Sequence, residues 1–158
     1  VTVCVCSQVN RHSRAKFKFI CFLLSRMIIA ASLVFERVLI VFQVKVISCS
    51  NGRLLTGFHV GPEHLNQRGT LHGGFIAHLV DAVSTYALTA NENVETRGVS
   101  IDLSVSYYTA AKEGDEIEVE AVTKKLGKKI AFLEVEVRNK ATNKILASGR
   151  HTKYIGFD

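Results

Sequence analysis

The chain lacks several features that common protein functions require. It contains no C-x-x-C pair, no G-x-G-x-x-G motif and no P-loop, which argues against redox, dinucleotide and NTP-binding loops. A disulfide framework or a zinc site needs cysteines spread through the fold at ligand spacing. The four cysteines instead lie in the first third of the chain, at Cys4, Cys6, Cys21 and Cys49. A reducing compartment therefore fits best.

Acidic residues are missing from residues 1–35, which hold five basic residues and so carry most of the net charge of +6. The other 15 basic residues are balanced by 14 acidic ones, so the rest of the chain is nearly neutral. A basic face for DNA or RNA is not indicated, and no nucleic-acid partner is expected. The hydrophobic content of 47% is typical of a globular protein.

Residues 1–34 differ from the rest and form an atypical N-terminal extension. The mostly apolar run at residues 17–35 is marginal in length for a membrane span and contains Arg26, which costs about 2.5–3.5 kcal/mol at a helix centre. No stable membrane insertion is expected. Three interpretations stay open: an organellar targeting peptide, a poor secretory signal, or a gene-model artefact. Residues 35–158 are expected to form one domain, because no repeat or linker interrupts them.

A loop, Gly69-Thr70-Leu71-His72-Gly73-Gly74, leads into the clearest helical pattern of the chain. Apolar residues recur at helical spacing and predict a helix over residues 73–91 with a wide buried face. The opposite strip lacks the Lys/Glu pairs usual on an exposed helix, but is expected to be solvated. Its members are Ala77, His78, Asp81, Ser84 and Thr85.

The remaining patterns predict an antiparallel sheet. Asn51-Gly52 between two apolar runs indicates a hairpin. Period-two alternation predicts strands near residues 99–108, 116–122, 131–138 and 145–152, and their short connections favour neighbours in chain order. One face of the first strand is expected to hold Ser100, Asp102, Ser104, Ser106 and Tyr108. The fold class is therefore α+β, with the helix packed on one face of the sheet.

Two residues of the helix point to chemistry. The first amides of a helix lack acceptors within it, so Gly73 is a candidate donor to an electron-rich oxygen, unless the glycines serve only the turn. Asp81 is a candidate carboxylate for activating water, or an ordinary solvated residue. Along the helix the two lie about 10–12 Å apart. That is too far for one oxygen to contact both within a single chain.

Three other groupings are weaker. A zinc site of His72, His78 and Asp81 would need His72 to lie on the same helix face as the others, so no metal is expected. A Ser84–His78–Asp81 triad lacks the G-x-S-x-G elbow. The lysine-rich stretch at residues 124–129 is either a solvated turn or a receptor for the phosphates of a ligand.

From residue 35 to its end the chain resembles the hotdog-fold acyl-CoA thioesterases, and among them the thioesterase superfamily member 2 group. The similar stretches follow the family's order and spacing over nearly four-fifths of the chain. They are residues 35–39, Asn66-x-x-Gly69-Thr70-Leu71-His72-Gly73-Gly74, Leu79-Val80-Asp81, Gly98-Val99-Ser100-Ile101-Asp102, Asn139-Lys140-Ala141-Thr142 and Gly149-Arg150-His151-Thr152-Lys153. The resemblance implies a hotdog fold, in which an antiparallel β-sheet wraps a long central helix.

The resemblance also implies an activity, the hydrolysis of medium- and long-chain fatty acyl-CoA, with no cofactor besides the CoA of the substrate. Carried over by motif, Asp81 and Ser100 hold the attacking water, and Asp81 is either general base or nucleophile. The Gly73 amide and Asn66 polarise the thioester carbonyl, with His72 beside them. The implied CoA-binding residues are Tyr107, Tyr108, Thr109, Ala110, Ala111, Lys112, Lys125, Leu126, Gly127, Lys128, Lys129, Ile130 and Tyr154.

The implied assembly is a homodimer that pairs into a homotetramer, with the loop of one subunit facing the helix of the other. Gly73 and Asp81 from different chains would then share one substrate. A lipid-binding protein is a further expected partner, and the expected compartments are the cytoplasm and mitochondria. Two alternatives stay open: a non-catalytic acyl-CoA- or lipid-binding protein on the same fold, and a thioesterase for short or aryl acyl-CoA.

Overall fold

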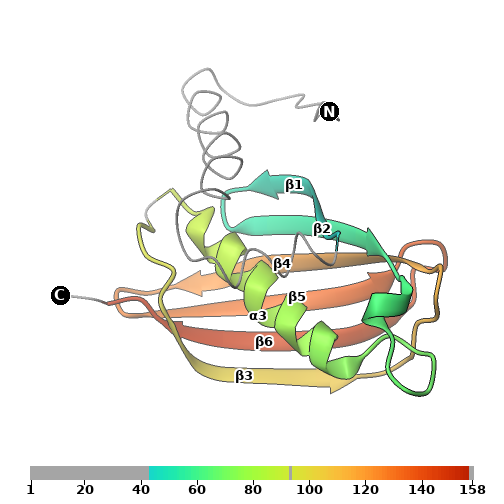
Figure 1. Ribbon diagram of the computed structural model, residues 1–158. Coiled ribbons are helices and arrows are strands. Elements are labelled where there is room, and N and C mark those ends of the chain that lie inside the picture. Colours follow the sequence, from blue (N-terminus) through green and yellow to red (C-terminus); the bar gives the residue numbers. More distant parts are fainter. Residues whose placement is uncertain (1–42, 93, 157–158) are drawn as a thin grey trace. The chain divides into compact units, whose positions relative to one another are not determined.

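A computed structural model describes residues 43–92 and 94–156, so the expectations for residues 1–34 and 35–39 lie outside the described residues. One long helix crosses a face of an antiparallel sheet (Figure 1). The elements are β1 (Lys45–Ser50), β2 (Arg53–His59), the 3₁₀ turn η1 (Pro62–His64), α3 (Gly73–Thr89), β3 (Val99–Tyr107), β4 (Glu116–Leu126), β5 (Ile130–Asn139) and β6 (Ile145–Tyr154). The predicted α+β class and hotdog fold are confirmed.

The sheet has six strands in the order β1-β2-β4-β5-β6-β3, and every neighbouring pair is antiparallel. The hairpin predicted at Asn51-Gly52 joins β1 to β2, and Gly52 has the positive φ of 74° that such a turn needs. The predicted helix is also present, although it ends at Thr89, two residues earlier than expected.

No helix in the described part of the chain is both long and apolar enough to span a bilayer.

The position of β3 corrects the expected strand order. β3 pairs with β6 and forms one edge of the sheet, whereas chain order would have placed it beside β4. The connection at residues 108–115 instead passes the ends of β5 and β6. Eight residues reach about 27 Å when extended, and three strand spacings measure about 14 Å. The connection was short enough to suggest neighbouring strands, yet it is long enough to skip two.

The polar strip of α3 is also placed differently from the expectation. The side chains of Ser84 and Thr85 are buried, at 0% and 9% exposure, and His78 and Asp81 are partly buried. The strip is not solvated because α3 contacts β6 and β3 as well as β2, β4 and β5. The sheet therefore covers the part of the strip that carries Ser84 and Thr85, and small polar residues replace the usual Lys/Glu pairs there because they must fit against β6.

A β-bulge in β3 changes the side of the sheet on which Ser100 lies. Ser100 pairs with Lys153, but Asp102 pairs with Thr152, so Ile101 is an extra residue in β3. An extra residue shifts the alternation by one position. Ser100 is therefore not on the face of Asp102, as the alternation predicted, but on the helix side with the buried residues of β6.

Helix and sheet approach closely at Gly149 of β6. A Cβ atom built on Gly149 would lie 2.4 Å from Cγ1 of Val80, a buried residue of α3 next to Asp81. Only a residue without a side chain fits there. This contact sets the height of α3 above β6 at the level of Asp81.

Candidate functional site

The loop before α3 is held by the side chain of Asn66. Its Oδ1 accepts hydrogen bonds from the Arg68 amide (2.9 Å) and the Thr70 amide (3.3 Å), and its Nδ2 donates to Thr70 Oγ1 at 2.9 Å. The Asn66 backbone amide also donates to the Thr70 carbonyl oxygen at 2.8 Å. Asn66 therefore closes the loop on itself, and it uses one of its two Nδ2 hydrogens to do so.

The ring of His64 anchors the same loop to the core. It is 1% exposed, accepts a hydrogen bond from the Gly61 amide at Nδ1, and stacks on Phe75 of α3 with ring centroids 5.0 Å apart. The His64 carbonyl oxygen accepts from the His72 amide at 2.8 Å. The start of the helix is thus fixed by a buried residue on which the sequence analysis had not commented.

His72 caps α3 and accepts hydrogen bonds from three amides of its first turn, but not from the amide of Gly73. Its Nδ1 accepts from the Gly74 amide at 2.9 Å, and its carbonyl oxygen accepts from the amides of Phe75 and Ile76. Within residues 43–92 and 94–156, no acceptor meets the amide of Gly73. A free amide at a helix N-terminus is a donor for an electron-rich oxygen.

Tyr107 ties the end of β3 to this helix start. Its hydroxyl donates to the Gly73 carbonyl oxygen at 2.9 Å, and the Leu71 amide donates to the Ala111 carbonyl oxygen at 2.9 Å. Ala111 itself is buried at 2% exposure, while Thr109, Ala110 and Lys112 are exposed. The predicted CoA-binding stretch at residues 107–112 therefore lies against the loop of Asn66, His72 and Gly73.

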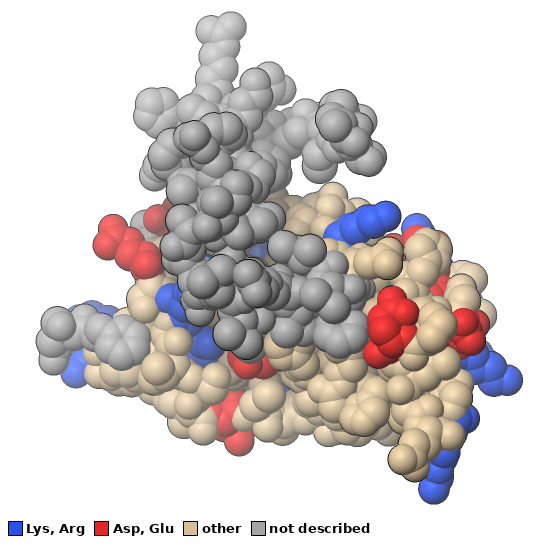
Figure 2. Space-filling model, viewed as in Figure 1, with Lys and Arg blue, Asp and Glu red and all other residues tan. Residues whose placement is uncertain are grey.

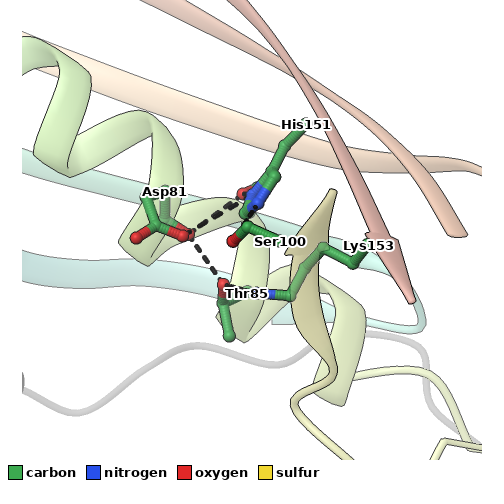
Figure 3. A network of polar contacts seen from close by, with 6 residues as sticks. Asp81, Thr85, Ser100, His151 and Lys153 are labelled. Atoms are coloured by element: carbon green, nitrogen blue, oxygen red, sulfur yellow. Dashed lines mark hydrogen bonds and ion pairs between the residues drawn. The ribbon is translucent and has the colours of Figure 1, made fainter. Parts of the chain in front are cut away.

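Asp81 and Ser100 are brought together by His151 of β6 (Figure 3). The imidazole Nε2 lies 2.8 Å from Ser100 Oγ, and Nδ1 lies 2.7 Å from Ser84 Oγ and 3.7 Å from Asp81 Oδ1. His151 is 1% exposed, whereas the Asp81 side chain keeps 30% of its surface accessible. The structure thus joins a reachable carboxylate and a hydroxyl through one buried ring.

Lys153 of β6 is linked to this network through Thr85 of α3. It is 4% exposed and donates from Nζ to Thr85 Oγ1 at 2.9 Å, and Thr85 Oγ1 in turn donates to the Asp81 backbone oxygen at 2.8 Å (Figure 3). Burial of an ammonium group is unfavourable unless the group is paired or hydrogen-bonded. Thr85 and the nearby Asp81 carboxylate supply that compensation.

Burial sets the protonation of the basic groups around Asp81. It lowers the pKa of His151 to about 4; the Lys153 ammonium acts in the same direction, and Asp81 and Asp102 oppose it. The pKa values of Lys153 and His78 are also lowered, because the effect of burial outweighs the opposing effect of the Asp81 carboxylate. His151 is therefore a neutral ring at neutral pH.

From the sequence, Ser84 was considered only in the rejected triad with His78 and Asp81, and no role was expected for His151, Lys153 or Thr85. A usable signal was present in β6, where alternation places Ala147, Gly149, His151 and Lys153 on the helix side. Two ionisable residues at the end of a small, inward-facing run are unusual, because buried charges need partners. That signal requires knowing which face of β6 is covered.

Other predicted residues are not brought together within one chain. Gly73 and Asp81 stay about 12 Å apart along α3, as the helical rise requires. The turn at residues 125–130 and Tyr154 lie at the end of the sheet where β3 begins, opposite the stretch at residues 107–112. His72, His78 and Asp81 do not gather into a metal-binding group, and the described residues contain no other such group.

The lysine-rich turn projects from the sheet. Residues 124–129 are all exposed, and Lys124 forms an ion pair with Glu134 at 3.1 Å. Tyr154 pairs with Ile130 of β5 and Val99 of β3, so the turn and Tyr154 share one end of the sheet. This end of the sheet therefore carries exposed positive charge.

Comparisons with known proteins agree with this fold. The family model of the thioesterase superfamily matches residues 68–146. Human acyl-coenzyme A thioesterase 13 is 44% identical over 122 residues, which are 77% of this chain and 85% of the human protein. The crystal structure of zebrafish thioesterase superfamily member 2 matches with a TM-score of 0.75 at 37% identity and covers 95% of this chain and 100% of that one.

The mouse thioesterase superfamily member 2 structure is similar to a comparable degree, with a TM-score of 0.71, 37% identity, and coverage of 96% of this chain and 100% of that one. The chain belongs to the thioesterase superfamily. As a member of it, the protein is a thioester hydrolase.

Proposed function

We propose that the protein hydrolyses medium- and long-chain fatty acyl-CoA to free fatty acid and CoA. The observation that carries this proposal is that the chain holds both an unsatisfied amide, that of Gly73, and a partly accessible carboxylate, that of Asp81. The acyl-CoA substrate is supported by the name of the human relative, acyl-coenzyme A thioesterase 13. A thioester is an activated acyl group, so these two groups suffice for its hydrolysis.

In the proposed reaction a water molecule attacks the thioester carbonyl carbon. The Asp81 carboxylate takes the proton of that water while the new C–O bond forms. The Gly73 amide and the remaining Nδ2 hydrogen of Asn66 donate to the carbonyl oxygen, where negative charge develops. The C–S bond then breaks, and the CoA thiolate leaves and takes up a proton.

The site is proposed to form between two subunits. β3 is an edge strand, and its exposed apolar side chains include Val99 (54%) and Ile101 (55%), which in an unpaired edge favour association with another strand. If β3 pairs with β3 of a second copy in antiparallel fashion, the start of each strand lies beside the end of the other. Ser100 and Asp81 would then face the partner subunit's Gly73. A further pairing of dimers gives the proposed tetramer.

The same pairing would gather the proposed CoA-binding segments. In one chain they lie at opposite ends of β3; across an antiparallel β3 pair, residues 107–112 approach the lysine turn of the partner. On the face shown in Figure 2, charges of both signs are scattered among uncharged residues, with no broad basic area in its described part. The proposed contacts for the CoA phosphates are the lysines of residues 124–129, which are exposed and gathered in one turn.

An acyl-CoA series from acetyl- to palmitoyl-CoA, with a thiol-trapping dye, tests the proposal. We expect turnover that rises toward the longer chains and is lost in Asp81→Asn, with acyl-CoA binding retained. Tight binding without hydrolysis by the wild type would instead support the non-catalytic alternative. Preference for acetyl- or phenylacetyl-CoA would support the short-chain or aryl alternative.

A single turnover in ¹⁸O-water separates the two roles open to Asp81. Attack by water places ¹⁸O in the fatty acid released first. Direct attack by the carboxylate forms an acyl-Asp81 anhydride, and its hydrolysis at the aspartyl carbon releases unlabelled acid.

A further inference from the structure

The hydrogen bonds around Asp81 have a definite direction. Lys153 Nζ has only hydrogens to offer, so Thr85 Oγ1 accepts from it and sends its own hydrogen to the Asp81 backbone oxygen. Ser84 Oγ donates its single hydrogen to the same oxygen at 3.0 Å. Two hydroxyls of α3 thus have their hydrogens committed to one backbone carbonyl.

This arrangement favours one tautomer of His151. With the Ser84 hydrogen given to the Asp81 backbone oxygen, Ser84 Oγ, 2.7 Å from Nδ1, accepts a hydrogen bond from a protonated Nδ1. The Asp81 carboxylate, 3.7 Å from Nδ1, favours a proton on the same nitrogen. In a neutral imidazole the other nitrogen, Nε2, is then an acceptor.

The chain of hydrogen bonds ends at Ser100. Its Oγ lies 2.8 Å from Nε2 of His151, and since Nε2 accepts, the hydroxyl hydrogen of Ser100 points toward the ring. The lone pairs of Ser100 Oγ are left for another donor. A water held between Ser100 and Asp81 would meet two acceptors and would give a hydrogen to each, which turns an oxygen lone pair toward the substrate.

We propose that His151 is a positioning residue, held as the Nδ1–H tautomer by Ser84 and Asp81, that takes the hydroxyl hydrogen of Ser100 and makes Ser100 an acceptor for the attacking water. The inference deepens the proposed function and rests on it for the role of the water. The tautomer itself rests on the hydrogen-bond directions alone. Lys153 supports the arrangement because a second positive charge on the ring beside it is unfavourable.

The same contacts resemble a Ser100–His151–Asp81 nucleophilic triad, and the electrostatics argue against one. A triad needs the ring to become positively charged when serine attacks, but burial and Lys153 lower the pKa of His151 to about 4. Nδ1 also lies closer to Ser84 Oγ than to the Asp81 carboxylate, at 2.7 Å against 3.7 Å. Ser100 is therefore assigned to orienting water and not to forming an acyl-enzyme.

A double-mutant cycle with myristoyl-CoA tests the positioning role. We expect His151→Phe to lower kcat on the order of tenfold with KM nearly unchanged, the scale of one lost hydrogen bond to a reacting group. His151→Gln, whose amide oxygen can accept from Ser100, should retain most of the activity. In a Ser100→Ala background, His151→Phe should lower kcat no further. An equal loss in both backgrounds, or an acyl-Ser100 species in the mass spectrum, would overturn the proposal.

The imidazole ¹⁵N shifts of the wild-type protein at pH 7 give a test that needs no activity. The signals of His151 are identified by their absence from His151→Gln. We expect a protonated Nδ1 and an unprotonated Nε2, and the reverse pattern or a doubly protonated ring would overturn the proposal. Failure of the wild type to hydrolyse any acyl-CoA would contradict the proposed function, while the ¹⁵N result would still decide the tautomer.

Discussion

The hydroxyl of Tyr107 donates to the carbonyl oxygen of Gly73 at 2.9 Å and so joins the last residue of β3 to the first residue of α3. The free amide of Gly73 consequently moves with the sheet edge and not with a flexible loop. If that edge is where a second subunit pairs, the same hydrogen bond carries the amide into the neighbouring site. The first two predictions follow from this connection.

Replacing Gly73 with proline should remove the proposed amide donor and little else. Proline is well tolerated at the first helical position, and His72 already has the extended backbone that a following proline requires (φ −68°, ψ 125°). We expect Gly73→Pro to lower kcat about 100-fold or more, the usual effect of losing one oxyanion donor. Gly73→Ala keeps the amide, and its Cβ would lie at an ordinary 3.4 Å from the Tyr107 ring. Equal losses in both variants would exclude the amide from catalysis.

Mixing two inactive variants should restore activity if each site is shared between subunits. In a heterodimer of Gly73→Pro with Asp81→Asn, one site carries both substitutions and the other carries neither. After unfolding and refolding of an equal mixture, we expect activity near one quarter of the wild-type value. No recovery, with heterodimers demonstrated by differently tagged chains, would place Gly73 and Asp81 in the same site of one subunit or in no common site.

The buried His151 should make the protein less stable in mild acid. Its pKa is about 4 in the folded protein against 6.5 in an ordinary environment. Between these two pH values the unfolded chain therefore binds a proton at this residue that the folded protein does not bind. The free energy of unfolding should therefore fall between pH 6.5 and 4 by up to about 3 kcal/mol from this group. Urea unfolding of His151→Gln should show a correspondingly flatter pH dependence; parallel curves for the two proteins would contradict it.

The lysine turn should affect binding more than chemistry. Reversing charge in Lys125→Glu/Lys128→Glu removes attraction to phosphates far from the reacting carbon, so we expect KM for palmitoyl-CoA to rise about tenfold and kcat to stay within about twofold. Lys45→Glu, on the strand at the other edge of the sheet, is the control and should leave KM unchanged. If the turn variant also keeps the wild-type KM, residues 124–129 are an ordinary solvated turn.

The contact of Gly149 with Val80 should be sensitive to a single methyl group. Gly149→Ala places a Cβ 2.4 Å from Val80 Cγ1, and we expect a loss of about 1–3 kcal/mol in the free energy of unfolding together with reduced kcat. Adding Val80→Ala makes room and should recover part of both. A double variant no more stable and no more active than Gly149→Ala would show that the crowding is not the cause.

Local signals in the sequence predicted local structure well. The Asn51-Gly52 hairpin and the helix from Gly73 depend on backbone preferences and periodicity within a few residues, and both are present. The strand order was wrong because the pairing of β3 with β6 joins residues about 50 positions apart. A connection's length limits which strands are neighbours but does not choose among those within reach.

The candidate site was predictable only in its outline. Motif resemblance pointed to Asp81, Ser100 and the loop before α3, and the structure gathers Asp81 and Ser100 on one side of the sheet. The resemblance included His151 and Lys153 in a similar stretch but gave them no role beside Asp81 and Ser100. Their role depends on the burial of one end of β6, which alternation alone does not report.

The bulge at Ile101 makes the length of β3 a functional quantity. Every strand residue before Ile101 points to the side opposite the one that uninterrupted alternation would give. Deleting Ile101 would remove the bulge and make Ser100 the direct neighbour of Asp102, so regular alternation would keep the Ser100 hydroxyl on the helix side and preserve the pairing with β6. Pairing Ile101 in a regular ladder would instead turn the hydroxyl outward, so a related chain without the bulge keeps this serine at the site only if its strand is one residue shorter. Comparisons of this superfamily therefore need to align strand length as well as residue type.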